Sequence, residues 1–222
     1  MDSSMGRPAL CAHPAAKMRN GGQSCIAANR IFVQDGIADA FVEALTERLA
    51  AIKVGHGLAP GVGLGPVIDH IAVARLTGLV EHATRRGAHL LTGGSASSHL
   101  GTFFESTLLD NVPADADLTR TEIFGPVAAI QGFSHQDEAV TRANDTEHGL
   151  AGYVLTENLD RAFNVADQLA TGLVGIIQGV PSNAAAPFGG VKQSGLGREG
   201  GSEGLEEYEE IRYYNLSLRP TS

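Results

Sequence analysis

Arg30-Ile31-Phe32-Val33-Gln34-Asp35-Gly36 and the helical pattern that follows it, over residues 37–52, decide the fold class. The first five residues are a β-branched and aromatic run that favours a strand, and Asp35-Gly36 ends it. The segment after this break places four apolar residues on one stripe at helical spacing: Phe41, Leu45, Leu49 and Ile52. The stretch therefore predicts a strand followed by an amphipathic helix, which is the repeating unit of α/β proteins.

The same alternation of strands and helices continues along the chain. Strands are predicted over residues 88–91, 103–109, 127–133, 151–155, 173–177 and 206–218. The segment 173–177 is apolar enough for a buried central strand. Helices are predicted over 68–86 with Gly87 as the stop, over 134–144 from a capping box at Ser134-His135-Gln136-Asp137, and over 158–170 with Asn158 as the cap. Residues 181–200 are rich in glycine and predict a structured loop. We therefore expect an α/β fold with a mostly parallel sheet flanked by helices.

The composition is that of an ordinary globular protein, and it argues against several classes of partner. The chain has 222 residues and a formal net charge of −9, so it is a poor ligand for nucleic acid or an anionic membrane. No apolar run approaches the roughly 18 residues of a membrane span, and the first residues lack a secretory signal. A cytoplasmic protein is therefore expected. Two cysteines in such a chain argue against a disulfide framework, and no metal site is predicted.

One cysteine lies in a setting that suits a nucleophile. In Asn20-Gly21-Gly22-Gln23-Ser24-Cys25, small residues would let a substrate and the backbone come close to the sulfur of Cys25. The thiolate is the form of cysteine that attacks a carbonyl carbon. A single cysteine beside glycines is also the pattern of a buried structural thiol, so the motif alone leaves both interpretations open.

Four segments in the same order resemble the aldehyde dehydrogenase family, and the resemblance covers residues from about Lys17 to about Leu218. They are the nucleophile segment Asn20–Cys25, the Glu122-Ile123-Phe124-Gly125-Pro126 motif, the turn Asn144-Asp145-Thr146 with Gly149-Leu150-Ala151, and the loop Pro187-Phe188-Gly189-Gly190-Val191-Lys192-Gln193-Ser194-Gly195. The resemblance implies that Cys25 attacks an aldehyde and forms a thiohemiacetal and then a thioester. It also implies NAD or NADP as cofactor, with Glu122 on the nicotinamide ribose and Phe124 near the nicotinamide.

Within the family, the chain is most similar to succinate-semialdehyde dehydrogenases. Lys17-Met18-Arg19-Asn20 and Ser182-Asn183 carry this similarity. It implies that Arg19 and Ser182 hold the distal carboxylate of a small aldehyde, which suits a guanidinium fork and a hydroxyl, and that Phe188 lines the aldehyde pocket. The alternatives are a surface ion pair for Arg19, a turn position for Ser182 and a core aromatic for Phe188.

The resemblance also implies a domain assignment with a missing part. Residues 17–207 correspond to the catalytic domain and 208–222 to the oligomerisation strand and tail, whereas 1–16 match no element, so that Cys11 is expected to lie outside the matched region. The dinucleotide-binding domain of the family, with its water-activating glutamate, is expected to be absent. Ile177 stands where the family has an asparagine after Gly-Ile, and Ala27 where some relatives have a second cysteine.

Three hypotheses about function follow from this assignment. The first is that the chain is the catalytic half of a semialdehyde dehydrogenase, inactive without the other half, which is lost or encoded separately. The second is a non-catalytic module that binds a full-length relative through Tyr208–Leu218 and regulates it. The third is a decayed fragment that exposes a large apolar face. A partner encoded nearby would favour the first, co-purification with a relative the second, and aggregation the third. The resemblance also implies a homo-oligomer.

Overall fold

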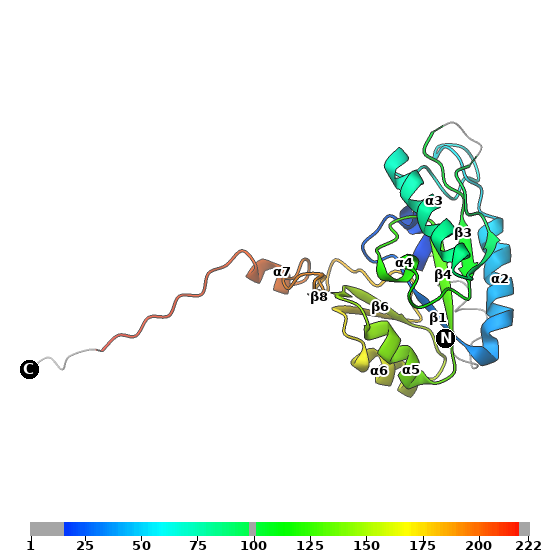
Figure 1. Cartoon of the computed structure of the whole chain (residues 1–222). Helices are drawn as coiled ribbons and strands as arrows, with labels where there is room; N and C mark the ends of the chain where they lie inside the picture. Colours follow the sequence, from blue (N-terminus) through cyan, green and yellow to red (C-terminus); the bar gives the residue numbers. More distant parts are fainter. Residues whose placement is uncertain (1–15, 98–100, 218–222) are drawn as a thin grey trace, which may run out of the picture.

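The computed structural model describes residues 16–97 and 101–217, so that Cys11 and the rest of 1–15 lie outside it (Figure 1). Residues 16–18 are helical and lead into a 3-10 turn. In chain order the elements are η1 (Arg19–Gly22), β1 (Ile31–Gln34), η2 (Asp35–Ile37), α2 (Ala38–Ala50), α3 (His70–Arg85), β2 (His89–Thr92), β3 (Thr107–Asp110), α4 (Asp117–Arg120), β4 (Val127–Phe133), α5 (Gln136–Asn144), β5 (His148–Gly149), β6 (Ala151–Val154), α6 (Leu159–Gln168), β7 (Leu173–Ile176), β8 (Val191–Lys192) and α7 (Glu203–Glu206).

The main sheet has four strands in the order β1-β4-β3-β2. β1 and β3 both run parallel to β4, with Ile31 opposite Ile130 and Thr107 opposite Val127, whereas β2 is antiparallel to β3. A second pair, β6 and β7, is also parallel, and β5 with β8 forms a short antiparallel pair. The predicted α/β fold with a mostly parallel sheet flanked by helices is therefore confirmed.

The central strand β4 shows why the fold has three layers. Val127 and Ala129 belong to one apolar cluster with helix α3, and Ala128 and Ile130 belong to another with helix α2. Side chains of a strand alternate between the two faces of a sheet, so β4 must be apolar on both faces. Figure 1 shows α2 and α3 on opposite sides of β3 and β4.

The two long helices begin and end close to where the sequence predicts. Phe41, Leu45 and Leu49 are the buried face of α2, as predicted, whereas Ile52 lies after the end of the helix and packs half-buried against the same cluster. Asp69 caps α3 by accepting a hydrogen bond from Ala72 N at 2.7 Å. Gly87 follows the helix with φ +104°, a backbone conformation that L side chains rarely adopt, which explains the stop at this position.

The prediction of a buried central strand at residues 173–177 is wrong. In the described part of the chain β7 pairs only with β6, and of its four residues only Gly175 is buried. The apolar residues indicated burial, but strand neighbours come from elsewhere in the chain and cannot be inferred from composition. The preceding helix is as predicted, since Asn158 Oδ1 accepts from Arg161 N at 2.9 Å.

Two predicted boundaries shift. The strand predicted over 103–109 begins at Thr107, because Phe104 forms only an isolated bridge with Ala96. The capping box predicted from Ser134 to Asp137 at the start of α5 is shifted by one residue. His135 is the N-cap, and its side chain makes no capping hydrogen bond. Glu138, in place of Asp137, accepts a hydrogen bond from Ser134 N at 3.1 Å. This hydrogen bond lowers the pKa of Glu138.

The strand predicted over 206–218 is not formed in the described residues. Helix α7 ends at Glu206, and residues 207–217 form no ladder and extend away from the body of the molecule (Figure 1). Tyr208 and Ile211 are 90% and 100% exposed. A strand needs a neighbouring edge for its backbone hydrogen bonds, and this tail meets none. Leu218 lies outside the described residues.

Candidate active site

Cys25 lies on an exposed loop that its own polar residues hold in place. Asn20, with φ 52°, donates from Nδ2 to Gln23 O at 2.9 Å, and Gln23 N donates back to Asn20 O at 3.1 Å. The side-chain oxygen of Gln23 accepts from Ile68 N at 2.9 Å. The N–H of Cys25 has no backbone acceptor in the part of the chain that the structure describes, so it is available to a substrate oxygen.

Gly22 connects this loop to the Glu122–Pro126 motif. Its φ is +70°, and a Cβ at this position would clash with the carbonyl group of Gly125. Only glycine satisfies both the backbone conformation and this close approach. Two motifs that lie about a hundred residues apart in the sequence are thereby packed against each other, which explains why the approach to Cys25 is built of small residues.

A hollow of about 590 Å³ brings together the four residues predicted for the nucleophile and the substrate. Arg19 and Cys25 come from the N-terminal loop, and Ser182 and Phe188 from the glycine-rich C-terminal segment. Its full lining is Arg19, Asn20, Gln23, Ser24, Cys25, Ile26, Ser182 and Phe188. The hollow therefore joins a thiol, a guanidinium, a hydroxyl and an aromatic ring around one space.

Phe188 is held in this hollow by a short antiparallel bridge. Its N–H donates to Glu199 O at 2.6 Å, and Glu199 N donates to Phe188 O at 2.7 Å. Arg198 fixes the surrounding glycine loop by donating from Nη1 to Gly190 O and Gly197 O, both at 2.9 Å. Residues 181–200 are thus a structured loop, as predicted from their glycine content.

Tyr153 is a residue of the site that the sequence did not indicate. Its hydroxyl donates to the carbonyl oxygen of Ile26 at 2.6 Å and so ties strand β6 to the residue after Cys25. Burial, and then the negative charge of a Cys25 thiolate, raise the pKa of Tyr153 to about 12, while Arg19 opposes the shift. The phenol therefore stays protonated and keeps donating at neutral pH.

The exposed residues Glu122 and Phe124 flank the buried residue Ile123 in the sequence. Asn29 fixes this segment, since its side chain donates to Thr121 O and accepts from Ile123 N, both at 2.8 Å. Glu122 lines a larger cleft that Cys25 also borders, whereas Phe124, 38% exposed and with φ 45°, lines neither the hollow nor this cleft. The structure thus places Glu122 and Cys25 on the same cleft and leaves Phe124 outside it.

Lys17 is buried directly before the site. Its side chain is 2% exposed, and among the described residues its Nζ has no hydrogen-bond partner. Burial lowers the pKa of Lys17 to about 7, a shift that Glu122 opposes and Arg75 reinforces. Arg75 itself donates to Glu122 O at 3.0 Å. Lys17 belongs to the segment Lys17-Met18-Arg19-Asn20, but no role was predicted for it. Its burial is not expected from the sequence, because lysines are seldom buried.

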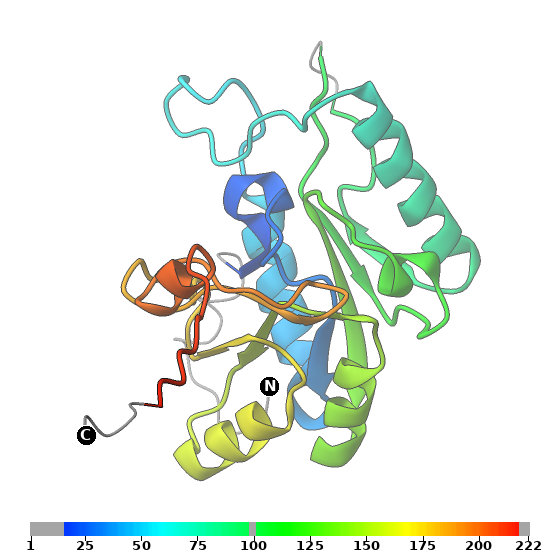
Figure 2. The same ribbon diagram turned by 90° about the vertical axis from the view of Figure 1, so that its left-hand side faces the viewer.

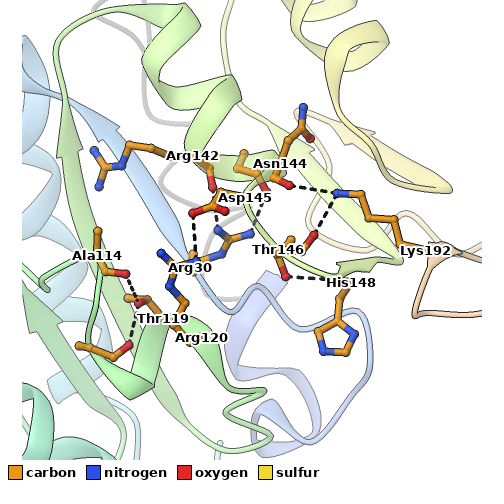
Figure 3. Close-up of polar contacts among 12 residues, drawn as sticks. Arg30, Ala114, Thr119, Arg120, Arg142, Asn144, Asp145, Thr146, His148 and Lys192 are labelled. Carbon is orange, nitrogen blue, oxygen red and sulfur yellow. Dashed lines mark hydrogen bonds and ion pairs between the residues drawn. The ribbon is translucent and has the colours of Figure 1, made fainter.

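The turn Asn144-Asp145-Thr146 connects three parts of the chain (Figure 3). Asn144 donates from Nδ2 to Gln168 O and accepts at Oδ1 from Ala170 N, both at 2.8 Å, and so joins the end of α5 to the end of α6. Lys192 Nζ donates to Asn144 O at 3.0 Å and to Thr146 O at 3.1 Å. The turn therefore holds the C-terminal loop, which carries Phe188, against the rest of the domain.

Arg30 supports the same turn from the other side. Its guanidinium donates to the last carbonyls of α5, Arg142 O at 2.7 Å and Ala143 O at 2.8 Å, where a cation is favoured at a helix C-terminus (Figure 3). Burial and the neighbouring guanidinium of Arg120 lower the pKa of Arg30, while Asp145 raises it. Arg120 is in turn paired with Asp145 at 3.0 Å.

Two kinds of feature are not seen in the part of the chain that the structure describes. No group of three or more His, Cys, Asp or Glu residues is placed to hold a metal ion. Among residues 16–97 and 101–217, no helix is both long enough and apolar enough to cross a bilayer.

Comparisons with known proteins agree on one family. The aldehyde dehydrogenase family model matches residues 9–214, so Cys11 lies inside the match, contrary to the expectation from the motifs. The NADP(+) succinate-semialdehyde dehydrogenase GabD of Escherichia coli (strain K12) is 45% identical over 204 residues, covering 92% of this chain and 42% of that protein. Glutarate-semialdehyde dehydrogenase of Pseudomonas aeruginosa is 48% identical over 201 residues, covering 90% and 42%.

A solved structure shows the same relation. Succinate-semialdehyde dehydrogenase from Burkholderia pseudomallei is 42% identical and superposes with a TM-score of 0.91, over 94% of this chain and 43% of that one. The chain thus spans about two fifths of the length of the relatives that it matches.

Proposed function

The chain belongs to the aldehyde dehydrogenase family, and we propose that it is the catalytic half of a semialdehyde dehydrogenase that oxidises a carboxylate-bearing aldehyde. The observation that carries this proposal is the hollow in which Cys25 lies with Arg19, Ser182 and Phe188. The names of relatives, succinate- and glutarate-semialdehyde dehydrogenase, support the same class of substrate.

In this proposal the chain's own groups bind and activate the aldehyde. Arg19 offers a planar pair of donors to the distal carboxylate, and Ser182 adds a hydroxyl donor. The Cys25 thiolate forms a bond to the aldehyde carbon, and the carbonyl electron pair moves to oxygen, which the N–H of Cys25 stabilises. Phe188 covers the apolar chain between the two ends of the substrate.

The chemistry that a nicotinamide dinucleotide would supply at this site is acceptance of a hydride from the carbon bonded to Cys25. The described residues supply one group that fits such a site: Glu122 borders the same cleft as Cys25 and is exposed, whereas Phe124 lines neither this cleft nor the hollow. Glu122 would accept hydrogen bonds from ribose hydroxyls. The choice between NAD and NADP depends on contacts outside these residues.

The chain alone is proposed to be inactive as a dehydrogenase. It spans about two fifths of its relatives, and the groups that it lacks by resemblance include a second oxyanion donor and a general base. Loss of such a donor typically costs about 2.7–4 kcal/mol of transition-state stabilisation. Loss of a general base typically costs about 10²–10⁴-fold in rate. Without a complete dinucleotide site the hydride has no acceptor.

An alternative function as an interaction module has one observation in its favour. The tail after α7 has no strand partner in the described residues, and it exposes large apolar and aromatic side chains, among them Tyr208, Ile211, Tyr213 and Leu216. An unpaired extended segment of this composition is suited to pair with the sheet edge of a second copy or a relative. Removal of residues 208–222 should then abolish any self-association measured by light scattering.

The carboxylate specificity is tested without the cofactor, by alkylation of Cys25. 4-Iodobutyrate places its reactive carbon and carboxylate at the spacing of succinate semialdehyde, and 4-iodobutyramide is its uncharged counterpart. We expect the acid to react faster than the amide, and Arg19→Met to reduce this ratio at least about tenfold, because a charge-assisted hydrogen bond contributes about 1.5–3 kcal/mol.

Cys25→Ala should abolish the labelling of this site, and Arg85→Met, which removes an exposed guanidinium that lines neither the hollow nor the cleft, should leave the ratio unchanged. A ratio that is the same in Arg19→Met and in the unchanged chain would contradict the proposed substrate class. Turnover of succinate semialdehyde with NAD or NADP by the chain alone, lost in Cys25→Ala, would contradict the proposed inactivity.

A further inference from the structure

Cys25 lies at the corner of a four-residue turn. Ala27 N donates to Ser24 O at 2.9 Å, so Cys25 and Ile26 are the two central residues of this turn. We call Ser24–Ala27 the nucleophile turn. In the described part of the chain, one hydrogen bond reaches its central residues from outside the turn: the Tyr153 hydroxyl donates to Ile26 O at 2.6 Å. This hydrogen bond is therefore the tertiary polar contact at the corner that carries the thiol.

Tyr153 is itself held by the strand that pairs with its own. It belongs to β6 and lies opposite Gly175 of β7 in the register of the parallel pair. A Cβ at Gly175 would lie 3.1 Å from Cδ1 of the Tyr153 ring and 2.7 Å from Gln178 O. The ring thus packs over a position that glycine leaves open, and it is half-buried there. Figure 2 shows β6, β7 and α6, in yellow-green to yellow, beside the four-stranded sheet.

The same strand pair leads to Ser182, which the proposed function assigns to the substrate carboxylate. Ile177 N donates to Val154 O at 2.9 Å, so the pairing of the two strands continues past the end of β7. Ser182 follows in the next loop and lines the hollow together with Cys25. Tyr153 therefore connects the turn that carries the thiol to the strands from which the substrate-binding loop emerges.

The charges around the phenol are consistent with a lasting hydrogen bond. Burial, and then the negative charge of the Cys25 thiolate, raise the pKa of Tyr153 to about 12, whereas Arg19 opposes the shift. Two residues that line the hollow thus act electrostatically on this hydroxyl. Because the phenol keeps its proton at neutral pH, it remains a donor to Ile26 O while the thiol of Cys25 ionises for attack.

We propose that Tyr153 is a positioning residue for the nucleophile: its hydrogen bond fixes the nucleophile turn against β6 and so sets where the Cys25 sulfur lies relative to Ser182. The inference rests on the proposed function, since it concerns the alignment of the thiol with a substrate that is held by its carboxylate. Tyr153 acts through the turn and is assigned no contact with the substrate. Without the hydroxyl, Arg19 and Ser182 still bind the carboxylate, but the sulfur is less often aligned with the reacting carbon, and bond formation is slower.

Saturation kinetics with 4-iodobutyrate separate alignment from binding. The Cys25 thiolate forms a bond to the carbon that carries iodine, and iodide leaves. The concentration at half-saturation reports the binding of the reagent, and the limiting rate reports the alkylation of the bound state. In Tyr153→Phe we expect the limiting rate to fall about three- to tenfold, the factor that one neutral hydrogen bond contributes, with half-saturation within about twofold of the unchanged chain. Iodoacetamide, which has no carboxylate, should react at a nearly unchanged rate.

A matched control and a second measurement accompany the kinetics. Thr84→Val removes a hydroxyl that donates to Val80 O at 2.9 Å in α3 and lines neither the hollow nor the cleft, so it should leave both constants unchanged. Hydrogen exchange of the Ala27 amide reports on the turn without any reagent. This amide should exchange about three- to tenfold faster in Tyr153→Phe, whereas the amides of α3 should keep their rates.

Three results would overturn the proposal. The first is an unchanged limiting rate in Tyr153→Phe that circular dichroism shows to be folded. The second is a change in half-saturation alone, which would make Tyr153 a substrate-binding residue. The third is equal slowing of 4-iodobutyrate and iodoacetamide, which would mean that the hydroxyl acts on the reactivity of the thiol and not on its place.

Failure of the proposed function gives a different result. If 4-iodobutyrate shows no saturation even in the unchanged chain, the proposed substrate class is wrong, and the exchange rate of the Ala27 amide decides the role of Tyr153. A faster rate in Tyr153→Phe would then support the positioning of the nucleophile turn by the hydroxyl, and an unchanged rate would overturn it.

Discussion

The buried amine of Lys17 makes the stability of this chain depend on pH in a way that can be calculated. Lys17 is 2% exposed, and burial lowers its pKa from 10.5 to about 7. In an unfolded chain the amine regains its ordinary pKa, so between these two values the unfolded state binds more protons. The free energy of unfolding therefore rises as the pH increases through this window.

The size of the effect follows from the two pKa values. With 10.5 in the unfolded chain and about 7 in the folded one, the burial of Lys17 costs about 4 kcal/mol at pH 7 and about 2 kcal/mol at pH 9. The chain should therefore gain about 2 kcal/mol of stability between pH 7 and pH 9. Lys17→Met keeps an unbranched apolar side chain and should remove this gain.

Urea denaturation at constant ionic strength, at pH 7, 8 and 9, measures the effect as a difference between variants. Lys53→Met, which replaces an exposed lysine, is the matched control and should keep the slope of the unchanged chain. Lys17→Met should also be the more stable protein at pH 7. Equal slopes in Lys17→Met and the unchanged chain would refute the argument, because the amine would then keep its proton on folding.

Three further substitutions test local features of the fold. Gly22→Ala should destabilise the chain by about 3 kcal/mol in thermal denaturation, because it combines a strained φ with a clash at Gly125, whereas Gly36→Ala, with open space around it, should stay within about 0.5 kcal/mol. Asn144→Ala should cost about 1–3 kcal/mol by leaving two backbone groups unpaired, and retention of full stability would exclude the proposed link between α5 and α6. Ile177→Asn should raise stability by about 1 kcal/mol, since Ile177 is β-branched at φ 51° and 45% exposed; a lower melting temperature would show that its side chain is needed.

Local structure was largely predictable from the sequence, because it depends on side-chain periodicity and caps. Phe41, Leu45 and Leu49 face the core, Gly87 follows α3, and Val127–Phe133 is a strand as predicted. Pairing was less predictable, because a strand is completed by residues far along the chain. The apolar sequence of β7 therefore did not indicate that this strand lies at an edge of its sheet. Likewise, the sequence after α7 did not indicate that this segment has no neighbouring strand in the described residues.

In the candidate site, too, the local motifs were predictable from the sequence, whereas contacts between distant residues were not. The motifs around Cys25, Arg19, Ser182 and Phe188 were recognisable one by one, and they remain assignments by resemblance that the hollow supports by bringing the residues together. Tyr153 was not predictable, since its link to Ile26 joins residues 127 positions apart. Nothing in the residues around Lys17 distinguishes a buried lysine from an exposed one.

The network of hydrogen bonds around Asn144–Thr146 has a consequence for the order of events in folding. Arg30 lies 112 residues from its partner Arg142 and Lys192 lies 48 residues from Asn144, so these distant segments must come together before the network forms. Contacts of such long sequence separation repay the entropy of loop closure late. Weakening this network, for example with Lys192→Met, should accelerate unfolding and leave the refolding rate nearly unchanged. The network therefore sets how long the folded state survives and has little influence on how fast that state forms.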